Sequence, residues 1–432
     1  MIEYLRYIAF WVLDFIRGGD FIKNYKDVKS INERFDSETS KNKRKQYLND
    51  ILQHAIESTT FYKKLDLPIK LENFPVTNKN LIRDNFHEFE STLFKDKKNY
   101  RVATSGSTGT PFTTYLNNNK RVRNSVDTIY FAEKSGFKLG KKLFYIRLWD
   151  KQHKKSRLSF WIQNIVSHDV SQLTDSDIEE LLKKMTKDNS TKGFLAYASA
   201  YDAICHYLDK IKSGPVFCNV SSIIAISEGL SDYARMSMKK YFCCDVVSRY
   251  SASETGILAQ QNVGSLNYDI NWASYYIEIL DFDEDIPVAY GEMGRIVITD
   301  LFNFAVPMIR YDTGDLGVMN LGENHKAPVL SKVEGRKMDM LYDTKGQLIT
   351  SHIVHQICLF KGINQYQLIQ ESKSDYTFKI NVNSDFNQEN ELIEKYRPYF
   401  GGDAIIKVDY VDDIPLLSSG KRKKVINRYY KN

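Results

Sequence analysis

The stretch "SSIIAISEGLSDYARMSMKKYFCCDVVSRYS", residues 221–251, carries the alternation that decides the fold. Its two ends, residues 221–227 and 245–251, are short apolar runs rich in β-branched side chains, which predict buried strands. Residues 230–242 between them have the pattern of a helix. Because a helix that connects two buried strands is the building unit of α/β sheets, we expect an α/β body, with a further strand at residues 294–300.

The C-terminal part of the sequence predicts a smaller α+β unit. Three strand-like runs, at residues 366–372, 376–382 and 404–411, surround a helical pattern at residues 387–400. We therefore place a boundary near residues 335–340. The expected organisation is an N-terminal helix region at residues 1–30, a large domain at residues 31–338 and a small domain at residues 339–432.

The composition is that of a globular protein with nearly balanced charge. Its 432 residues are 42% hydrophobic, and 60 basic against 54 acidic residues give a net charge of +6. This balance does not by itself argue for a nucleic-acid binder. The five cysteines form no CxxC pair, which favours a reducing, cytoplasmic setting without structural zinc.

The first 17 residues predict an amphipathic helix. Glu3, Arg6, Asp14 and Arg17 fall roughly on one face, and apolar residues occupy the rest. The charges interrupt the apolar run too early for a membrane span, and no signal-peptide cleavage pattern follows. Two alternatives stay open: the helix docks on the protein's own body, or it rests on a membrane surface, which would be the inner face for a cytoplasmic protein.

A loop of small residues, "TSGSTGT" at residues 104–110, is the first candidate binding motif. Glycines let backbone N–H groups approach a phosphate closely, and serine and threonine hydroxyls add neutral donors. The loop is not a Walker motif, because Gly109 is followed by Thr110 and Pro111 rather than by lysine. Taken alone, it predicts either a phosphate site or an ordinary polar connection.

Three later residues suit chemistry on a bound phosphate chain. Glu254 follows a predicted strand and could ligate magnesium, and Asp315 lies in a Gly-bounded turn where it could accept both ribose hydroxyls. Lys421 follows a Ser-Ser-Gly segment and could bring a cation to a reacting centre. Each also has a plain structural interpretation: a surface carboxylate, an aspartate that caps its own turn, and a basic tail.

In their order along the chain, five motifs resemble the core motifs of the adenylate-forming superfamily, which includes the acyl-CoA synthetases. They are "TSGSTGTP", "YSASETG", "IRYDTGD", "VEGRKMDM" and "SSGKRKK". The segment "LENFPVTNKNLIRDNF", residues 71–86, is similar to the phenylacetate-CoA ligase branch, and within it to CapK-type proteins associated with bacterial capsular polysaccharide biosynthesis. The resemblance spans about residues 70–426 and implies a large multi-layer N-terminal domain with a small mobile α+β C-terminal domain.

The resemblance implies a nucleotide site built from several of these motifs. The residues that would wrap the β- and γ-phosphates of ATP are Thr104, Ser105, Gly106, Ser107, Thr108, Gly109 and Thr110. Tyr250 would pack on adenine, with Ser227 and Glu228 near the base. Asp315, helped by Arg336, would hold the ribose.

The resemblance also implies a reaction centre and a hinge. Ser253 and Glu254 would hold the α-phosphate region and Mg²⁺. Lys421 would lie between the α-phosphate and the carboxylate of the substrate. Asp339 would be the hinge about which the small domain turns.

Two residues depart from the pattern of these relatives. Ser251, within the nucleotide-binding segment, replaces the usual glycine and adds bulk beside the acyl pocket, which favours a small or polar acid. Asp312 adds negative charge near the phosphates. The segment after Glu254 also lacks the cysteines that some relatives carry there, so we expect no zinc site.

The implied function is ATP-dependent activation of a carboxylic acid as an acyl-adenylate, with release of pyrophosphate. The acyl group would then pass to coenzyme A or another carrier in surface-polysaccharide biosynthesis. Because positioning, Mg²⁺ and a lysine carry this chemistry, no nucleophilic side chain is needed. Two alternatives stay open: the acceptor is an amine or a sugar hydroxyl, or the protein binds nucleotide without turnover as a partner of other proteins.

Overall fold

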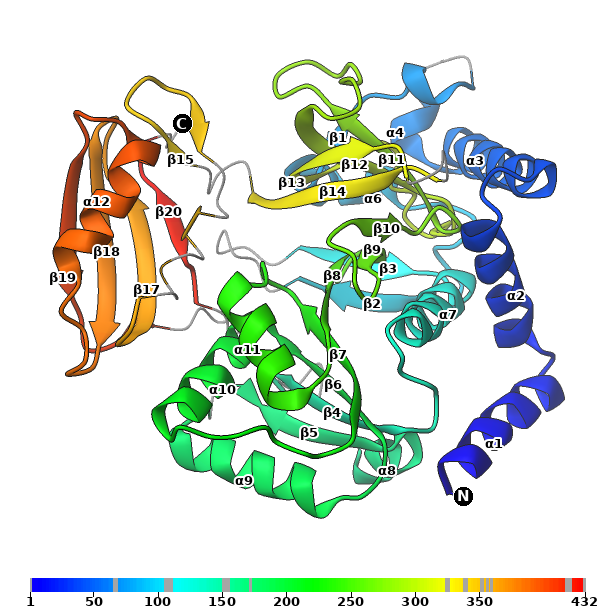
Figure 1. Ribbon diagram of the computed structural model, residues 1–432. Coiled ribbons are helices and arrows are strands. Elements are labelled where there is room, and N and C mark those ends of the chain that lie inside the picture. The colour runs from blue at the N-terminus through cyan, green and yellow to red at the C-terminus, as the bar shows by residue number, and fades with distance from the viewer. Residues whose placement is uncertain are drawn as a thin grey trace. The chain divides into compact units, whose positions relative to one another are not determined.

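Figure 1 shows the computed structural model, which describes residues 2–64, 69–104, 112–149, 156–170, 173–322, 327–336, 341–349, 353–354, 357, 360–415 and 422–429. The chain divides into two compact units. Unit 1 comprises Met1–Gly140 and Arg249–Val333, and unit 2 comprises Lys141–Ser248 and Glu334–Asn432. The predicted boundary at residues 338 and 339 lies outside the described residues, so the predicted domain limits stay predictions.

Unit 1 begins with helices whose ends are capped by polar side chains. Its helices are α1 (Ile2–Ile16), α2 (Asp20–Glu33), α3 (Glu38–Ser58), α4 (Thr60–Lys63), α5 (Lys79–Asp84), α6 (Phe86–Phe89) and α7 (Asn118–Lys134), with a 3₁₀ turn at Leu71–Asn73. Gly19 precedes α2 and has no side chain to cap it. Asp14 does so instead, because its carboxylate accepts the N–H groups of Phe21 at 3.0 Å and Ile22 at 2.9 Å.

Helix α1 confirms the predicted N-terminal amphipathic helix. One half of it packs on α2: the ring of Phe10 lies 5.4 Å from that of Phe21, and the ring of Trp11 lies 5.6 Å from that of Tyr25. The opposite half is exposed to solvent. In the part of the chain that the structure describes, no helix is long and apolar enough to cross a membrane.

The main sheet of unit 1 contains parts of two quoted motifs, "YSASETG" in β8 and "IRYDTGD" in β13. Its strands follow the order β11-β12-β13-β14-β10-β9-β8, and short β1 pairs in parallel with β13. The strands of the unit are β1 (Thr77–Asn78), β2 (Tyr100–Ala103), β3 (Thr113–Leu116), β8 (Val246–Ala252, from Arg249), β9 (Gly256–Gln261), β10 (Tyr268–Ile270), β11 (Tyr275–Leu280), β12 (Met293–Asp300), β13 (Tyr311–Asn320) and β14 (Val329–Arg336, to Val333). β2 and β3 form a separate hairpin, and β12 confirms the strand predicted at residues 294–300.

The first part of unit 2 is a parallel sheet in the order β5-β4-β6-β7-β8, which includes β8 as far as Ser248. Its elements are β4 (Lys142–Arg147), α8 (Arg157–Gln163), β5 (Ile165–Asp169), α9 (Asp175–Lys187), β6 (Lys192–Tyr197), α10 (Ala198–Lys210), β7 (Val220–Ile226) and α11 (Asp232–Phe242). Every residue of β6 is buried, as expected for a parallel strand covered on both faces. β7, α11 and β8 confirm the strand–helix–strand prediction for residues 221–251.

The C-terminal part of unit 2 is a four-stranded sheet in the order β19-β18-β17-β20, with one helix. Its elements are β15 (Leu341–Tyr342), β16 (Leu348–Ile349), β17 (Ile363–Gln370), β18 (Asp375–Val382), α12 (Glu389–Phe400), β19 (Ile405–Tyr410) and β20 (Val425–Asn427). Phe378, Tyr396 and Phe400 pack together in the core under α12. These elements confirm the strands and the helix predicted for the C-terminal part, and the mixed α/β class of the whole chain is as predicted.

Candidate functional site

Two of the predicted nucleotide-binding residues, 65 positions apart in sequence, meet in unit 1. Tyr250 on β8 donates its hydroxyl to the Asp315 carboxylate on β13 at 2.8 Å. The Thr313 hydroxyl lies 3.2 Å from the same phenol oxygen and accepts the backbone N–H of Asp315. Burial and the Asp315 charge raise the pKa of Tyr250 well above its ordinary value of 10.0, so the phenol keeps its proton and orients the carboxylate.

Glu254 belongs to a second group of polar side chains in unit 1. It is buried, with an exposed fraction of 6%, and Tyr311 of β13 donates a hydrogen bond to its carboxylate at 3.1 Å. The ammonium group of Lys79, the first residue of α5, lies 3.7 Å from the same Oε1 atom. Burial, followed by the Glu254 charge, raises the pKa of Tyr311 well above 10.0, so this phenol also remains a donor.

The anchors of the small-residue loop lie beside this second group. Thr104 and Phe112 close the β2–β3 hairpin, with the Thr104 N–H donating to the Phe112 carbonyl at 2.8 Å. The Lys79 ammonium stands 5.5 Å from the centre of the Phe112 ring. The predicted phosphate-binding residues Ser105, Gly106, Ser107, Thr108, Gly109 and Thr110 lie outside the described residues. The structure thus places the base of the loop next to the Lys79–Glu254 pair.

The turn that carries Ser253 and Glu254 is fixed by a glycine. Gly256 has φ +112°, and an added Cβ would lie 2.7 Å from Asn124 Oδ1 and 3.0 Å from the Tyr275 hydroxyl. β8 and β9 also change register between Tyr250 and Ser251. Because a bulge redirects the residues that follow it, this irregularity sets the direction of the turn. Ser251 itself lies in β8, opposite Ile257.

The charge of Asp312 is paired with that of a cation on the neighbouring strand. Arg295 of β12 lies 2.9 Å from Asp312 Oδ2, and the N–H of Gly314 donates to Oδ1 at 2.8 Å. Asp312 therefore fixes the backbone of β13 at Gly314, the residue before Asp315. The expectation that Asp312 adds negative charge near the phosphates stays a prediction, and the ion pair with Arg295 compensates part of that charge.

Other predicted site residues lie in unit 2 or outside the described residues. Ser227 is exposed, with φ +72°, and Glu228 accepts the N–H of Ser199 at 2.9 Å, where α10 begins. Glu228 thus has a structural role at a helix N-terminus. Arg336 ends β14, and only its backbone is described. The predicted hinge residue Asp339 and the predicted catalytic residue Lys421 lie outside the described residues.

Sequence reasoning missed two members of the site. Tyr311 stands inside the quoted motif "IRYDTGD", yet nothing in that pattern indicates that its hydroxyl reaches Glu254. Lys79 stands in the segment "LENFPVTNKNLIRDNF", which was used only to identify a branch of relatives. Its position depends on the parallel pairing of Thr77 with Tyr311, which carries the start of α5 to the site. In the described ranges, no group of three or more histidine, cysteine, aspartate or glutamate side chains could hold a metal ion.

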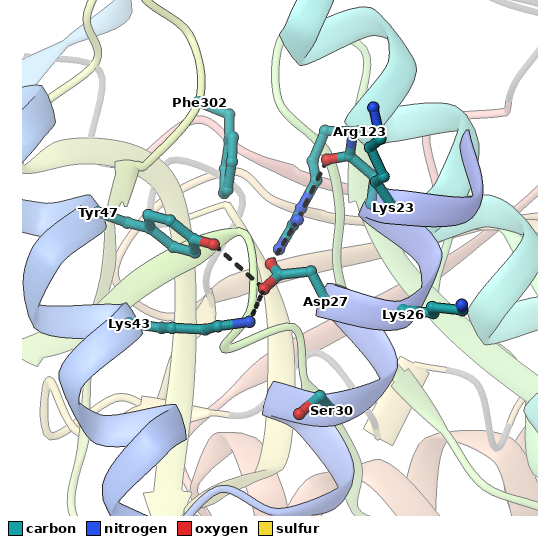
Figure 2. A pocket seen from close by; sticks show the side chains of 9 residues that line it. Lys23, Lys26, Asp27, Ser30, Lys43, Tyr47, Arg123 and Phe302 are labelled. Atoms are coloured by element: carbon teal, nitrogen blue, oxygen red, sulfur yellow. Dashed lines mark hydrogen bonds and ion pairs between the residues drawn. The ribbon is translucent and has the colours of Figure 1, made fainter. Parts of the chain in front are cut away.

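A separate cavity of about 510 Å³ opens in unit 1, and Figure 2 shows it from close by. It is lined by Lys23, Asn24, Lys26, Asp27, Ser30, Lys43, Tyr47, Arg123 and Phe302. None of the predicted site residues lines it. Asp27 lies in its centre, 2.7 Å from the Lys43 ammonium and 2.8 Å from the Arg123 guanidinium, and accepts the Tyr47 hydroxyl at 3.1 Å. This ion-pair cluster joins α2, α3 and α7.

Replacing Asp27 with asparagine should remove stability in a pH-dependent way. Although burial favours the neutral acid, Arg123 and Lys43 lower the pKa of Asp27 below its ordinary 3.8. A carboxylate whose pKa is lower in the folded than in the unfolded protein stabilises the fold fully at pH values above its unfolded pKa. This stabilisation is lost as the pH falls through the folded pKa. In urea titrations, the difference in unfolding free energy between wild type and variant should stay constant from pH 7 to about 5 and shrink below that.

The control is Asp20→Asn, which changes an exposed carboxylate on the same helix. The difference in unfolding free energy between Asp20→Asn and wild type should not show the pH dependence expected for Asp27→Asn. A difference for Asp27→Asn that stays constant as the pH falls to 3 would contradict the ionised pairing.

Comparison with solved structures identifies the class of fold. The chain superposes on 2-hydroxyisobutyryl-CoA ligase in its postadenylation state with R3-HIB-AMP, with a TM-score of 0.69, 16% identity and 88% of each chain covered. It also superposes on ATP-bound MatB from Rhodopseudomonas palustris, with a TM-score of 0.56, 15% identity and coverage of 75% of this chain and 66% of that one. The fold is therefore that of the acyl-CoA ligase-type adenylate-forming proteins, as predicted.

Sequence comparison indicates which branch of the adenylate-forming proteins the chain resembles. Residues 341–428 match the family described as the CapK C-terminal domain. The chain is 25% identical over 212 residues to the phenylacetate-coenzyme A ligase of Aromatoleum evansii, a match that covers 45% of this chain and 48% of that protein. The chain thus spans about half the length of this curated relative. These findings confirm the resemblance to the CapK and phenylacetate-CoA ligase branch.

Proposed function

We propose that this protein activates a carboxylic acid with ATP as an acyl-adenylate, releases pyrophosphate and transfers the acyl group to coenzyme A. The observation that carries the proposal is the grouping in unit 1 of the Tyr250–Asp315 pair, the Tyr311–Glu254–Lys79 group and the base of the small-residue loop. The named relative supports it, because it is a CoA ligase, and the solved neighbours bind an acyl-adenylate or ATP.

The Asp315 carboxylate is the proposed ribose ligand. Tyr250 holds one of its oxygens at 2.8 Å, and the Thr313 hydroxyl fixes the backbone N–H of Asp315, so the carboxylate is oriented before a nucleotide binds. A pre-oriented carboxylate loses little conformational entropy when it accepts hydroxyl groups. We propose further contacts of the nucleotide with Ser227, Glu228, Ser251 and Arg336.

Glu254 is the proposed magnesium ligand. Mg²⁺ prefers oxygen donors and is commonly held by one or two carboxylates together with substrate phosphates, which a single buried glutamate fits. When bound, the ion would neutralise charge on the triphosphate. Tyr311 fixes the Glu254 carboxylate and Lys79 adds a cation beside it, while Ser253 and the loop from Thr104 to Thr110 are the proposed phosphate donors.

Lys421 is the proposed catalytic cation and Asp339 the proposed hinge. A carboxylate that attacks the α-phosphorus brings two anions together, so a lysine at that point stabilises the charge that grows in the transition state. The two residues belong to the chain segment that ends unit 2, and rotation of a small domain would bring such a lysine to the site and withdraw it.

We also propose a cytoplasmic role in surface-polysaccharide biosynthesis, which is the role that the resemblance to CapK-type proteins implies. An acceptor panel of coenzyme A, amines and sugars distinguishes this thioester route from amide or ester formation. Nucleotide binding without any turnover would favour the partner-protein alternative.

The decisive experiment measures acid-dependent pyrophosphate release with ATP and Mg²⁺ over a panel of small carboxylic acids. We expect release with one class of acid, and a decrease on the order of 10²-fold or more for Lys421→Ala, because a transition-state cation is lost. The control is Lys187→Ala, an exposed lysine on α9, which should keep the wild-type rate. Pyrophosphate release that is equal in Lys421→Ala and wild type would contradict the assignment.

A further inference from the structure

Half of helix α1 is an uninterrupted apolar surface. At about 100° per residue, the side chains from Tyr4 and Phe15 round to Ile2 and Leu13 span an arc of about 180° that contains no charged residue. The large apolar side chains on this arc are 39% to 80% exposed, with Phe15 at 80%. Such a concentration of exposed apolar side chains on one 15-residue helix indicates an interaction surface, because single exposed side chains are common but contiguous patches are not.

The other half of α1 is held in place, so the apolar half cannot turn inward. Phe10 and Trp11 pack edge-to-face on Phe21 and Tyr25 of α2. Buried Asp14 accepts two N–H groups at the start of α2. The backbone of α1 at Glu3 also contacts Gly140, where any side chain would collide with it. The helix is therefore fixed to unit 1 with its apolar half outward.

The charge at the edge of this surface is positive. Arg6 lies about 20° beyond Leu13 on the helical projection, and exposed Arg17 follows the helix on the same side. The carboxylates of the segment are turned elsewhere: Asp14 is buried against α2, and Glu3 lies on the packed half. A cationic edge beside an apolar surface is complementary to anionic lipid headgroups above acyl chains.

We propose that α1 docks unit 1 on the surface of an anionic lipid bilayer, with the helix lying in the plane of the headgroup region. The width of the apolar arc favours a bilayer over a second copy of the chain. A helix pair buries a narrow stripe, whereas a helix at a bilayer interface buries about half of its circumference. This inference is independent of the proposed ligase activity, because it uses no residue of that site.

Co-sedimentation of the full chain with vesicles tests the proposal. The variant Val12→Gln/Phe15→Gln/Ile16→Gln removes three exposed apolar side chains and retains good helix formers. We expect wild type to bind vesicles of phosphatidylcholine with phosphatidylglycerol, more weakly those of phosphatidylcholine alone, and the triple variant to bind at least tenfold more weakly. Arg17→Gln should reduce the preference for the anionic vesicles. The matched control is Phe217→Gln/Met236→Gln, which changes exposed apolar residues of unit 2 and should bind like wild type.

Two results would overturn the proposal. The first is wild-type protein that does not sediment with anionic vesicles, or a triple variant that binds as wild type does. The second is a wild-type dimer in analytical ultracentrifugation that becomes monomeric in the triple variant, without vesicle binding, which would assign the apolar half to a second copy. Unchanged circular dichroism and thermal midpoints in all variants verify that folding is retained.

Discussion

Replacing Glu254 with glutamine should reduce acid-dependent pyrophosphate release by on the order of 10²–10³-fold without unfolding unit 1. Glutamine has nearly the same size, and its amide oxygen can still accept the Tyr311 hydroxyl that now lies 3.1 Å from the carboxylate. What is lost is the negative charge that we propose as the magnesium ligand. The measurement is the initial rate of pyrophosphate release as a function of Mg²⁺ concentration.

The variant Tyr311→Phe distinguishes the positioning role of Tyr311 from the proposed metal-ligating role of Glu254. It removes one hydrogen bond to Glu254 and leaves the carboxylate, so we expect a higher Mg²⁺ requirement with a smaller decrease of the saturated rate. A merely structural role of Tyr311 would lower the amount of folded protein without changing the Mg²⁺ dependence. A Glu254→Gln protein that works at the wild-type rate would exclude Glu254 from the metal site.

The alternation of short-range patterns made most of the secondary structure predictable. The apolar runs at residues 221–227 and 245–251 became β7 and β8, and residues 387–400 became α12, because each of these signals resides within its own segment. The division of the chain into two compact units could not be predicted in the same way. Residues 141–248 and 334–432 share a unit through contacts such as the 2.9 Å ion pair of Asp202 with Lys424, which leave no periodic trace in either segment.

The same distinction applies to the candidate site: residues within recognisable motifs could be predicted, and residues placed by long-range strand pairing could not. Tyr250 and Asp315 could be assigned to one site because their motifs resemble those of known nucleotide binders, and the 2.8 Å hydrogen bond joins them. Lys79 could not, because its place depends on the two-residue strand β1, which is too short to show any period. The role of Arg295 could not be predicted for a similar reason, since its pairing with Asp312 depends on the register shift of β12 against β13 between Arg295 and Val297.

Removing the charge of only one member of the buried Lys120–Asp300 ion pair should destabilise unit 1 by about 3–5 kcal/mol. Both side chains are fully buried, and the Lys120 ammonium lies 2.7 Å from Asp300 Oδ2 and donates to the Tyr275 hydroxyl at 2.9 Å. Burial lowers the pKa of Lys120, and the Asp300 charge opposes that shift. In Lys120→Met the Asp300 charge stays buried without its cation, and in Asp300→Asn the Lys120 charge does.

The double variant Lys120→Met/Asp300→Asn should recover much of this loss. It removes both charges together, and the amide oxygen of asparagine can still accept the N–H groups of Phe302 and Asn303 that Asp300 Oδ1 binds at 3.0 and 3.2 Å. Because the chain has two units, native-state hydrogen exchange of the α7 amides measures the stability of unit 1 more directly than a global unfolding curve. If the two single losses simply add in the double variant, the pair is not coupled, and the penalty arises from packing rather than from an isolated buried charge.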